Sequence, residues 1–374
     1  MLRVGIVGCG KIADQHAEQI LLIPGCEIVA VCDQEELMAQ QLRERLNVGK
    51  CFTEVQDLLD KAKPDVIHIT TPPQSHYALG KLCLEAGCHV YVEKPFTINA
   101  TEAEELIRIA EHKDLKLTVG HDAQFSHSAI RMRGLVEEGF LGGPPLHLES
   151  YHCYDLGDVN YAKAVLGDSN HWVRKLPGGL LQNNISHGIS KVAEFLTGDS
   201  PKIFAFGFVS PLMRGIGETS IIDELRVIIH DEVATAYYTF SSQMRPSLHQ
   251  LRLYGPKNGL VRDDDQQTVI RIGGSRYKSY LEQFVPPLDY AKQYVVNSLG
   301  NVGKFMRADF QSNYGKKVLI QTFYNSIMKG SALPIPYTEI LRTSRIMDEI
   351  FSQLNSAQNT SGAKHGAKVP VQQR

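Results

Sequence analysis

The chain has 374 residues, enough for two or three domains at about 150 residues each. Hydrophobic residues make up 43% and charged residues 21%, which excludes wholesale disorder. The 39 Lys and Arg against 41 Asp and Glu give a net charge of −2, so no nucleic-acid partner is expected. No apolar run reaches the ~20 residues of a membrane-spanning helix, and the run at 4–7 is too short for a secretory signal.

The seven cysteines form no Cys-x-x-Cys pair, and most lie in apolar segments, as Cys26, Cys32, Cys83 and Cys88 do. Such residues usually act as small buried hydrophobic side chains. A reducing, cytoplasmic location is therefore expected, and no metal site is expected.

Residues 1–121 alternate short apolar runs with amphipathic stretches. The apolar runs are continuous, as in 66–69, which favours strands buried on both faces of a parallel sheet. Strands are predicted at 3–8, 27–33, 50–53, 65–71, 89–93 and 116–121, with helices at 11–23, 34–46, 54–61, 76–87 and 101–112. This alternation predicts a doubly wound α/β domain over 1–121.

Residues 122–354 show a different pattern, which predicts an α+β domain with an open, largely antiparallel sheet. The segments 223–230 and 233–240 are predicted to form a hairpin. Strands are predicted at 146–153, 202–209, 223–230, 233–240, 249–254 and 268–272, with helices at 127–138, 180–196, 280–298, 308–329 and 337–354. The polar, basic residues 355–374 are predicted to be a disordered tail.

Two segments of this second part have alternative interpretations. The aromatic, mildly basic residues 286–310 could lie on a membrane or meet a lipid-linked substrate. A core or dimer-contact helix is the more ordinary interpretation, so membrane contact is not expected. The run 262–265 (Arg-Asp-Asp-Asp) is predicted to be a solvated turn without metal-ligand spacing.

The hexapeptide 8–13 fits the pattern G-x-G-x-x-G/A, directly after a strand and at the start of a helix. Gly8 and Gly10 permit a tight turn and close approach of a pyrophosphate, and the helix start at Lys11 and Ile12 supplies partial positive charge. Asp33 ends the second strand, where a carboxylate can accept hydrogen bonds from ribose hydroxyls. Because that carboxylate repels a 2′-phosphate, NAD is predicted rather than NADP.

Two further segments lie at the carboxyl edge of the predicted sheet, where open α/β folds bind ligands. One runs over 70–76 and the other is Glu93-Lys94-Pro95. On the pattern alone, Lys94 could equally be a surface lysine paired with Glu93.

A third polar group lies at 178–187, in the predicted helix 180–196. Asn183 and His187 are four residues apart and would share one helix face. Histidine is well suited to exchange a proton near neutral pH, although a single histidine at a helix start is more often structural.

In order and spacing, these motifs resemble the glucose–fructose oxidoreductase / inositol dehydrogenase / MocA (Gfo/Idh/MocA) family. The match covers residues 1–200 by motif and the remainder more loosely. The motifs that carry it are Gly8-Cys9-Gly10 with Ile12-Ala13, Thr71-Pro72-Pro73 with His76, Glu93-Lys94-Pro95, Gly120 with Phe125, and Gly178-Gly179 with His187.

The resemblance implies a Rossmann domain, a second domain whose open sheet forms oligomer interfaces, and hydride transfer between NAD(P) and a hydroxyl carbon of a sugar, cyclitol or nucleotide-sugar. By position, Lys94 would hydrogen-bond the reacting oxygen and His187 would act as the acid/base. Thr71, Pro72 and His76 would border the nicotinamide. The residues at 151–155 and around His171, Trp172 and Arg174 could line the substrate pocket.

Three positions depart from the family pattern. Asn183 stands where the family usually has Asp, and Gln124 stands where it has Arg. Ser190, which Lys191 follows, stands at a second position where the family often has Asp. These changes leave the lysine and histidine in place but put the substrate in doubt. Two alternatives to net oxidation remain: elimination through transient oxidation by retained NAD, and dinucleotide binding without catalysis.

Overall fold

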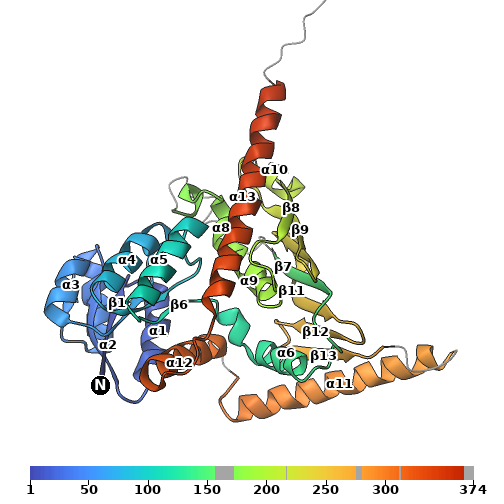
Figure 1. Cartoon of the computed structure of the whole chain (residues 1–374), viewed down its shortest axis with the longest axis horizontal. Coiled ribbons are helices and arrows are strands. Elements are labelled where there is room, and N and C mark those ends of the chain that lie inside the picture. Colours follow the sequence, from blue (N-terminus) through green and yellow to red (C-terminus); the bar gives the residue numbers. More distant parts are fainter. Residues whose placement is uncertain (156–171, 216, 275–279, 311–312, 366–374) are drawn as a thin grey trace, which may run out of the picture.

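The computed structural model describes residues 1–155, 172–215, 217–274, 280–310 and 313–365, with side chains as far as residue 356. Two sheets are set side by side with α13 (Tyr337–His365) standing between them (Figure 1). The described helices include none long and apolar enough to cross a membrane. All seven cysteines are free thiols.

The first sheet is parallel, with strand order β3-β2-β1-β4-β5-β6, and helices cover both of its faces. The predicted doubly wound fold is confirmed. Its strands are β1 (Leu2–Val7), β2 (Cys26–Cys32), β3 (Cys51–Phe52), β4 (Val66–Ile69), β5 (His89–Val92) and β6 (Leu117–Val119). Its helices are α1 (Lys11–Leu21), α2 (Glu36–Leu46), α3 (Val55–Ala62), α4 (His76–Glu85) and α5 (Ala100–His112).

The core around this sheet also takes side chains from the end of the chain. Leu319, Ile320, Phe323 and Tyr324 of α12 (Tyr314–Lys329) are fully buried in it. The division at residue 121 stays a prediction, and α12 packs on the domain that precedes that point.

The second sheet has seven strands in the order β13-β12-β11-β7-β10-β9-β8. It is largely antiparallel, with one parallel pair, β7 and β10, and the predicted hairpin of β9 and β10 is confirmed. The strands are β7 (His147–Asp155), β8 (Lys202–Phe208), β9 (Glu224–His230), β10 (Thr235–Ser241), β11 (Gln243–Tyr254), β12 (Gly259–Asp263) and β13 (Thr268–Ile272).

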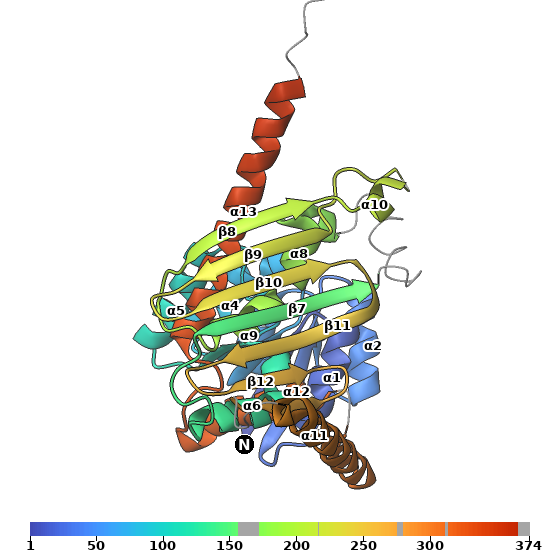
Figure 2. The same cartoon turned by 90° about the vertical axis from the view of Figure 1, so that its right-hand side faces the viewer.

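Helices α8 (Gly179–Asn184) and α9 (Ser186–Ala193) lie between this sheet and the Rossmann domain, whereas no helix among the described residues covers the opposite face of the sheet (Figure 2). The remaining α-helices are α6 (His127–Glu137), α10 (Pro211–Gly215) and α11 (Leu281–Met306). The sheet therefore presents its inner face to the site and its outer face to solvent.

Several predicted helix boundaries were wrong: the helix predicted at 280–298 runs to Met306, and the one predicted at 308–329 begins at Tyr314. The helix predicted at 180–196 is two short helices separated only by Ile185, whose backbone stays in the right-handed helical region, and the second of them ends at Ala193. The tail predicted from residue 355 is helical as far as His365, where α13 ends. A polar composition is compatible with helix when the preceding turns are anchored, as Ile350 and Leu354 are in the core.

Candidate active site

A cleft of about 990 Å³ opens at the carboxyl ends of β1, β2, β4 and β5. It collects nearly all the residues predicted to hold a cofactor, together with the catalytic candidates Lys94 and Asn183. Those cofactor residues are Gly8, Gly10, Lys11, Ile12, Asp33, Thr71, Pro72, Glu93 and Lys94. Segments almost ninety residues apart in sequence therefore meet at the edge predicted for ligand binding.

The glycine turn has one close-packed and one open position. Gly8 has φ +95°, and a Cβ there would lie 2.7 Å from Thr71 Cγ2. Thr70 Oγ1 also donates a 2.6 Å hydrogen bond to the Gly8 carbonyl. A Cβ at Gly10 would meet nothing within 4 Å, and α1 begins directly after it without a side-chain cap. The turn thus offers open space and free backbone N–H groups, as an anion at a helix start requires.

The Asp33 carboxylate is fixed by two backbone hydrogen bonds at the tip of β2. Its Oδ2 accepts from the Cys9 N–H (2.7 Å) and its Oδ1 from the Glu35 N–H (3.0 Å). The carboxylate therefore ties the glycine turn to the neighbouring strand and holds a negative charge at the edge of the cleft.

His76 does not line the cleft. It is fully buried, with Nε2 2.9 Å from the Thr71 carbonyl oxygen and Nδ1 2.9 Å from the Pro95 carbonyl oxygen. The ring thus bridges the loop after β4 and the loop after β5. His76 therefore holds these two loops together beside the cleft and does not face it.

Lys94 connects the two halves of the molecule. Its Nζ lies 3.3 Å from the main-chain oxygen and 3.5 Å from the side-chain oxygen of Asn183, on α8. Burial lowers the pKa of Lys94, and the carboxylates of Glu93 and Asp122 oppose that change. Lys94 is therefore not the surface lysine of the alternative interpretation.

Glu93 is occupied by partners that sequence reasoning missed. Its Oε1 accepts from Lys316 Nζ on α12 (2.9 Å) and is 2.7 Å from His16 Nε2, while Oε2 accepts from the Lys94 N–H. Burial opposes ionisation, but Lys316 and His16 hold the pKa of Glu93 well below its usual range. A Cβ on Gly120 would lie 3.1 Å from this carboxylate. The glycine of the family motif therefore leaves room for the Glu93 side chain.

The network continues behind Glu93 into the core. His16 Nδ1 is 2.8 Å from His68 Nδ1, and His68 Nε2 is 3.0 Å from the Tyr324 hydroxyl. A histidine inside the apolar strand 66–69 was the one signal in the sequence that could have pointed to it.

His187 lies on α9 with its ring centroid 5.5 Å from that of His152 on β7. Burial lowers the pKa of His187 well below 6.5, and the positive charge of Lys94 lowers it further. The imidazole is therefore neutral at neutral pH. Unlike Lys94 and Asn183, His187 is not among the residues that line the cleft.

Part of the predicted substrate lining faces the same side. The Tyr154 hydroxyl is 2.7 Å from His152 Nε2, and His249 contacts both rings from β11. Arg174 pairs instead with Glu218 (3.2 Å), and His171 lies outside the described residues. The rings of His152, Tyr154 and His249 thus form one cluster that His187 joins through His152.

The run 262–265 is a solvated turn only in part: Arg262 and Asp263 end β12, the turn begins at Asp264, and Asp265 is exposed. Arg262 is 1% exposed, and its Nε donates to Asp264 Oδ1, which shares its carboxylate with Lys191. Burial makes a compact ion-paired cluster necessary, because an unpaired charge there would be costly. Lys191, one of the departures from the family pattern, is therefore paired with Asp264. Among the described residues no three His, Cys, Asp or Glu side chains are grouped as a metal site would need.

Gln124, another departure, is also buried. Its side-chain amide donates to Glu339 on α13 and to Glu194 (3.3 Å), where a family arginine would bring a charge. Burial raises the pKa of Glu339 to about 7, and Glu194 adds to that shift.

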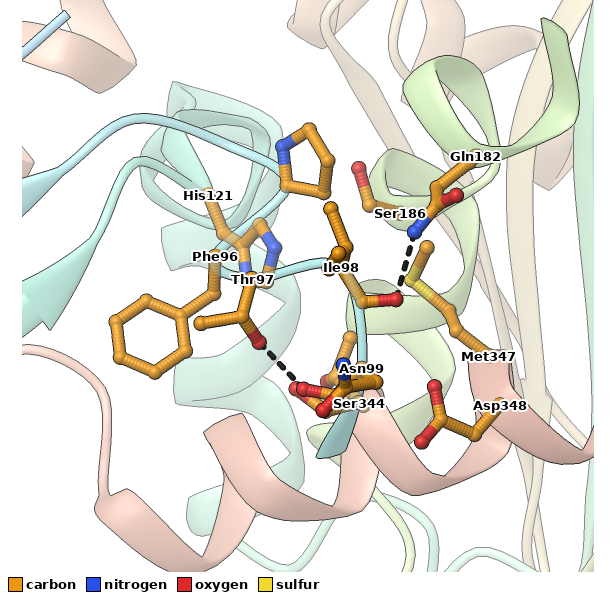
Figure 3. A pocket seen from close by; sticks show the side chains of 12 residues that line it. Phe96, Thr97, Ile98, Asn99, His121, Gln182, Ser186, Ser344, Met347 and Asp348 are labelled. Carbon is orange, nitrogen blue, oxygen red and sulfur yellow. Dashed lines mark hydrogen bonds between the residues drawn. The ribbon is translucent and has the colours of Figure 1, made fainter. Parts of the chain in front are cut away.

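A small polar pocket lies behind Lys94, between the loop 95–99, α8, α9 and α13 (Figure 3). Gln182 donates to the Ile98 carbonyl (2.8 Å), which fixes α8 against the loop that follows Lys94. The volume of this pocket, about 10 Å³, suits a single water. Gln182 and Ser186 line this pocket, and each directly precedes a predicted site residue, Asn183 or His187.

The parallel sheet, the glycine turn, the uncapped helix start and the fixed acidic strand tip together define a dinucleotide-binding Rossmann domain. Residues 2–121 match the model of the Gfo/Idh/MocA oxidoreductase family, described as an NAD-binding Rossmann fold. The resemblance seen in the motifs is therefore confirmed over these residues.

Similar proteins extend the likeness beyond these residues. Myo-inositol 2-dehydrogenase of Thermotoga maritima is 22% identical over 76% of this chain and 83% of its own. UDP-N-acetylglucosamine 3-dehydrogenase of Acidithiobacillus ferrooxidans is 33% identical over 40% of this chain and 44% of its own. An NAD binding oxidoreductase from Klebsiella pneumoniae shares the fold over 95% of this chain and 97% of its own, at 19% identity and a TM-score of 0.74.

Proposed function

We propose that this protein is an NAD-dependent oxidoreductase that acts on a hydroxyl carbon of a sugar, cyclitol or nucleotide-sugar. The observation that carries the proposal is the position of Lys94. Its Nζ lies at the inner end of the dinucleotide cleft, against Asn183 of the helical layer that also bears His187.

The described residues fit NAD. The open space at Gly10 and the backbone N–H groups at Lys11 and Ile12 would hold the pyrophosphate, and Asp33 would accept hydrogen bonds from the ribose. The fixed charge of Asp33 supports NAD over NADP. Thr71 and Pro72 would border the ring end of the cofactor, next to Lys94.

Bound NAD supplies the hydride acceptor. The protein then has to orient one alcohol and take its proton. Lys94 would donate a hydrogen bond to the reacting oxygen and stabilise its developing negative charge. His187, which its surroundings keep neutral, would accept the hydroxyl proton in oxidation and return it in reduction. Asn183 would hold Lys94 and orient the substrate, but it cannot accept the proton.

The substrate class is supported by the relatives, which are named for inositol and for UDP-N-acetylglucosamine. The imidazole and phenol groups at His152, Tyr154 and His249 can hydrogen-bond neutral hydroxyls. We further propose a homo-oligomer formed through the uncovered sheet face. That face exposes Phe204, Phe206, Ile228 and Tyr237.

The test is nicotinamide absorbance with NAD and a panel of inositols, glucosides and UDP-sugars. The parent chain should reduce NAD with at least one of them. Lys94→Met and His187→Asn should each lower kcat at least about a hundredfold, the range lost with a catalytic proton-transfer group, while NADH binding measured by fluorescence is kept. Turnover of the panel without net reduction, or full activity in Lys94→Met, would contradict the proposal.

A further inference from the structure

A surface helix normally turns its apolar face to the protein and its polar face to solvent. In helix α11 the polar face lies against the protein and the apolar face lies in solvent. It contacts the sheet through amides: Gln293 accepts from the Arg271 N–H (2.8 Å) and donates to the Arg271 carbonyl (3.0 Å). One turn later, Asn297 exchanges the same pair of bonds with Val269 (3.3 and 3.2 Å). These side chains pair with the free edge of β13 as another strand would.

The apolar residues of α11 point away from the protein. They recur three or four residues apart along the whole helix, which is the spacing of one helix face. We call this face the outward stripe; it consists of Leu281, Phe284, Leu288, Ala291, Val295, Leu299, Val302 and Met306. All eight are exposed, and the seven larger ones are each more than half exposed.

Apart from its contacts with β13 and α6, the helix projects beyond the rest of the molecule (Figures 1 and 2). Its 26 residues span about 39 Å at ~1.5 Å per residue. Large side chains open to solvent offer ~150–250 Å² each, so the stripe leaves roughly 800 Å² of apolar surface uncovered. One partner contributes about that area to a stable protein–protein interface.

We propose that the outward stripe packs on the outward stripe of a second copy of this chain, so that two α11 helices form an interface separate from the open sheet. A continuous stripe of one helix face fits the same stripe of another helix, and a two-fold axis can place it on itself. If the sheet face also pairs, two different self-complementary patches on one chain give a tetramer with dihedral symmetry.

A membrane surface is the other occupant this face could have, and the charges argue against it. A helix that lies on a bilayer carries Lys and Arg on its polar face. In α11 the charged residues are Glu282, Asp289, Lys292 and Lys304, which sum to zero. Its polar face is moreover bound to β13 and is not available to lipid headgroups.

The first experiment measures the mass of the full chain by light scattering after size exclusion. The double variant Leu288→Lys/Val295→Lys should halve the mass of the parent assembly and keep the far-UV circular dichroism spectrum. Gln283→Lys, an exposed change on the same helix outside the stripe, should keep the parent mass. A double variant with the parent mass, or a monomeric parent, would overturn the proposal.

The second experiment identifies the occupant directly. A photo-cross-linking residue at Leu299, in a mixture of isotopically heavy and light chains, should yield heavy–light cross-links between peptides of 281–306. Cross-links confined to other segments would overturn the proposal. Co-sedimentation of a monomeric parent with vesicles of phosphatidylglycerol and phosphatidylcholine would do so as well, in favour of a membrane surface.

Discussion

The side-chain nitrogen of Lys94 lies 3.3 Å from the main-chain oxygen of Asn183, and this contact joins the Rossmann domain to the helical layer under the second sheet. Both residues border the cofactor cleft. Any change in one therefore acts on the charge and position of the other. The family's usual aspartate at this position would pair with Lys94, whereas the amide leaves the lysine without a counter-charge there.

The charge of residue 183 should control the pH profile. Asn183→Asp places a carboxylate beside Lys94 and near His187, which favours the charged form of both and raises both pKa values. Since His187 accepts a proton only when it is neutral, the acidic limb of kcat/KM for oxidation should move to higher pH by about one unit. The measurement is a pH series of initial rates. An unshifted limb would show that residue 183 does not act on the base.

Asp33 should decide between the two nicotinamide dinucleotides. Asp33→Asn removes the charge and keeps one acceptor oxygen, which can serve only one of the two backbone N–H groups, of Cys9 and Glu35, that bond Asp33. Loss of repulsion toward a 2′-phosphate should lower the ratio of the Kd for NADPH to that for NADH by about tenfold, or ~1.4 kcal/mol. Fluorescence titration with both cofactors measures the ratio. The proposed cofactor preference fails if the parent already binds NADPH as tightly as NADH.

Lys316 should be essential for stability because it neutralises a buried carboxylate. Lys316→Met leaves Glu93 with His16 and the Lys94 N–H but without its ion-pair partner, and an uncompensated buried charge costs about 3 kcal/mol of unfolding free energy. Chemical denaturation measures the loss. Adding Glu93→Gln should restore part of it, because the uncompensated charge is then gone. Strictly additive losses in the double variant would contradict a direct charge pairing.

Glu339 should make the protein less stable as the pH rises. Its pKa in the folded chain is raised to about 7 from 4.5, so folding binds a proton between these values and that stabilisation is lost as pH passes through about 7. Glu339→Gln cannot ionise, and its side-chain oxygen can still accept from Gln124. Its Tm should exceed that of the parent at pH 8 and match it near pH 4. An equal difference at both values would exclude ionisation as the cause.

The parts of the fold predictable from sequence are those set by local patterns. Continuous apolar runs, as at 66–69, indicated the strands of the parallel sheet, and the glycine turn with Asp33 indicated the cofactor cleft. These signals depend on neighbouring residues alone. The break at Ile185 was missed, since residues 184–186 contain neither Gly nor Pro to mark the end of a helix.

Long-range charge pairs could not be predicted in this way. Lys316 is 223 residues from Glu93, and nothing in either segment indicates the other. Asp264 looked like part of a solvated turn because charged runs usually are, but Lys191 lies 73 residues earlier and meets it inside the protein. Only the packing of α9 and α12 against the two sheets brings these charges together.

A crystal structure with NADH bound tests the central claim most directly. It should show the pyrophosphate at the N–H groups after Gly10 and the nicotinamide beside Thr71 and Pro72. Lys94 and His187 should both point at the space over the reactive face of that ring, within hydrogen-bond reach of one shared oxygen position. A nicotinamide bound elsewhere, or a His187 side chain turned away from the space that Lys94 faces, would contradict the account.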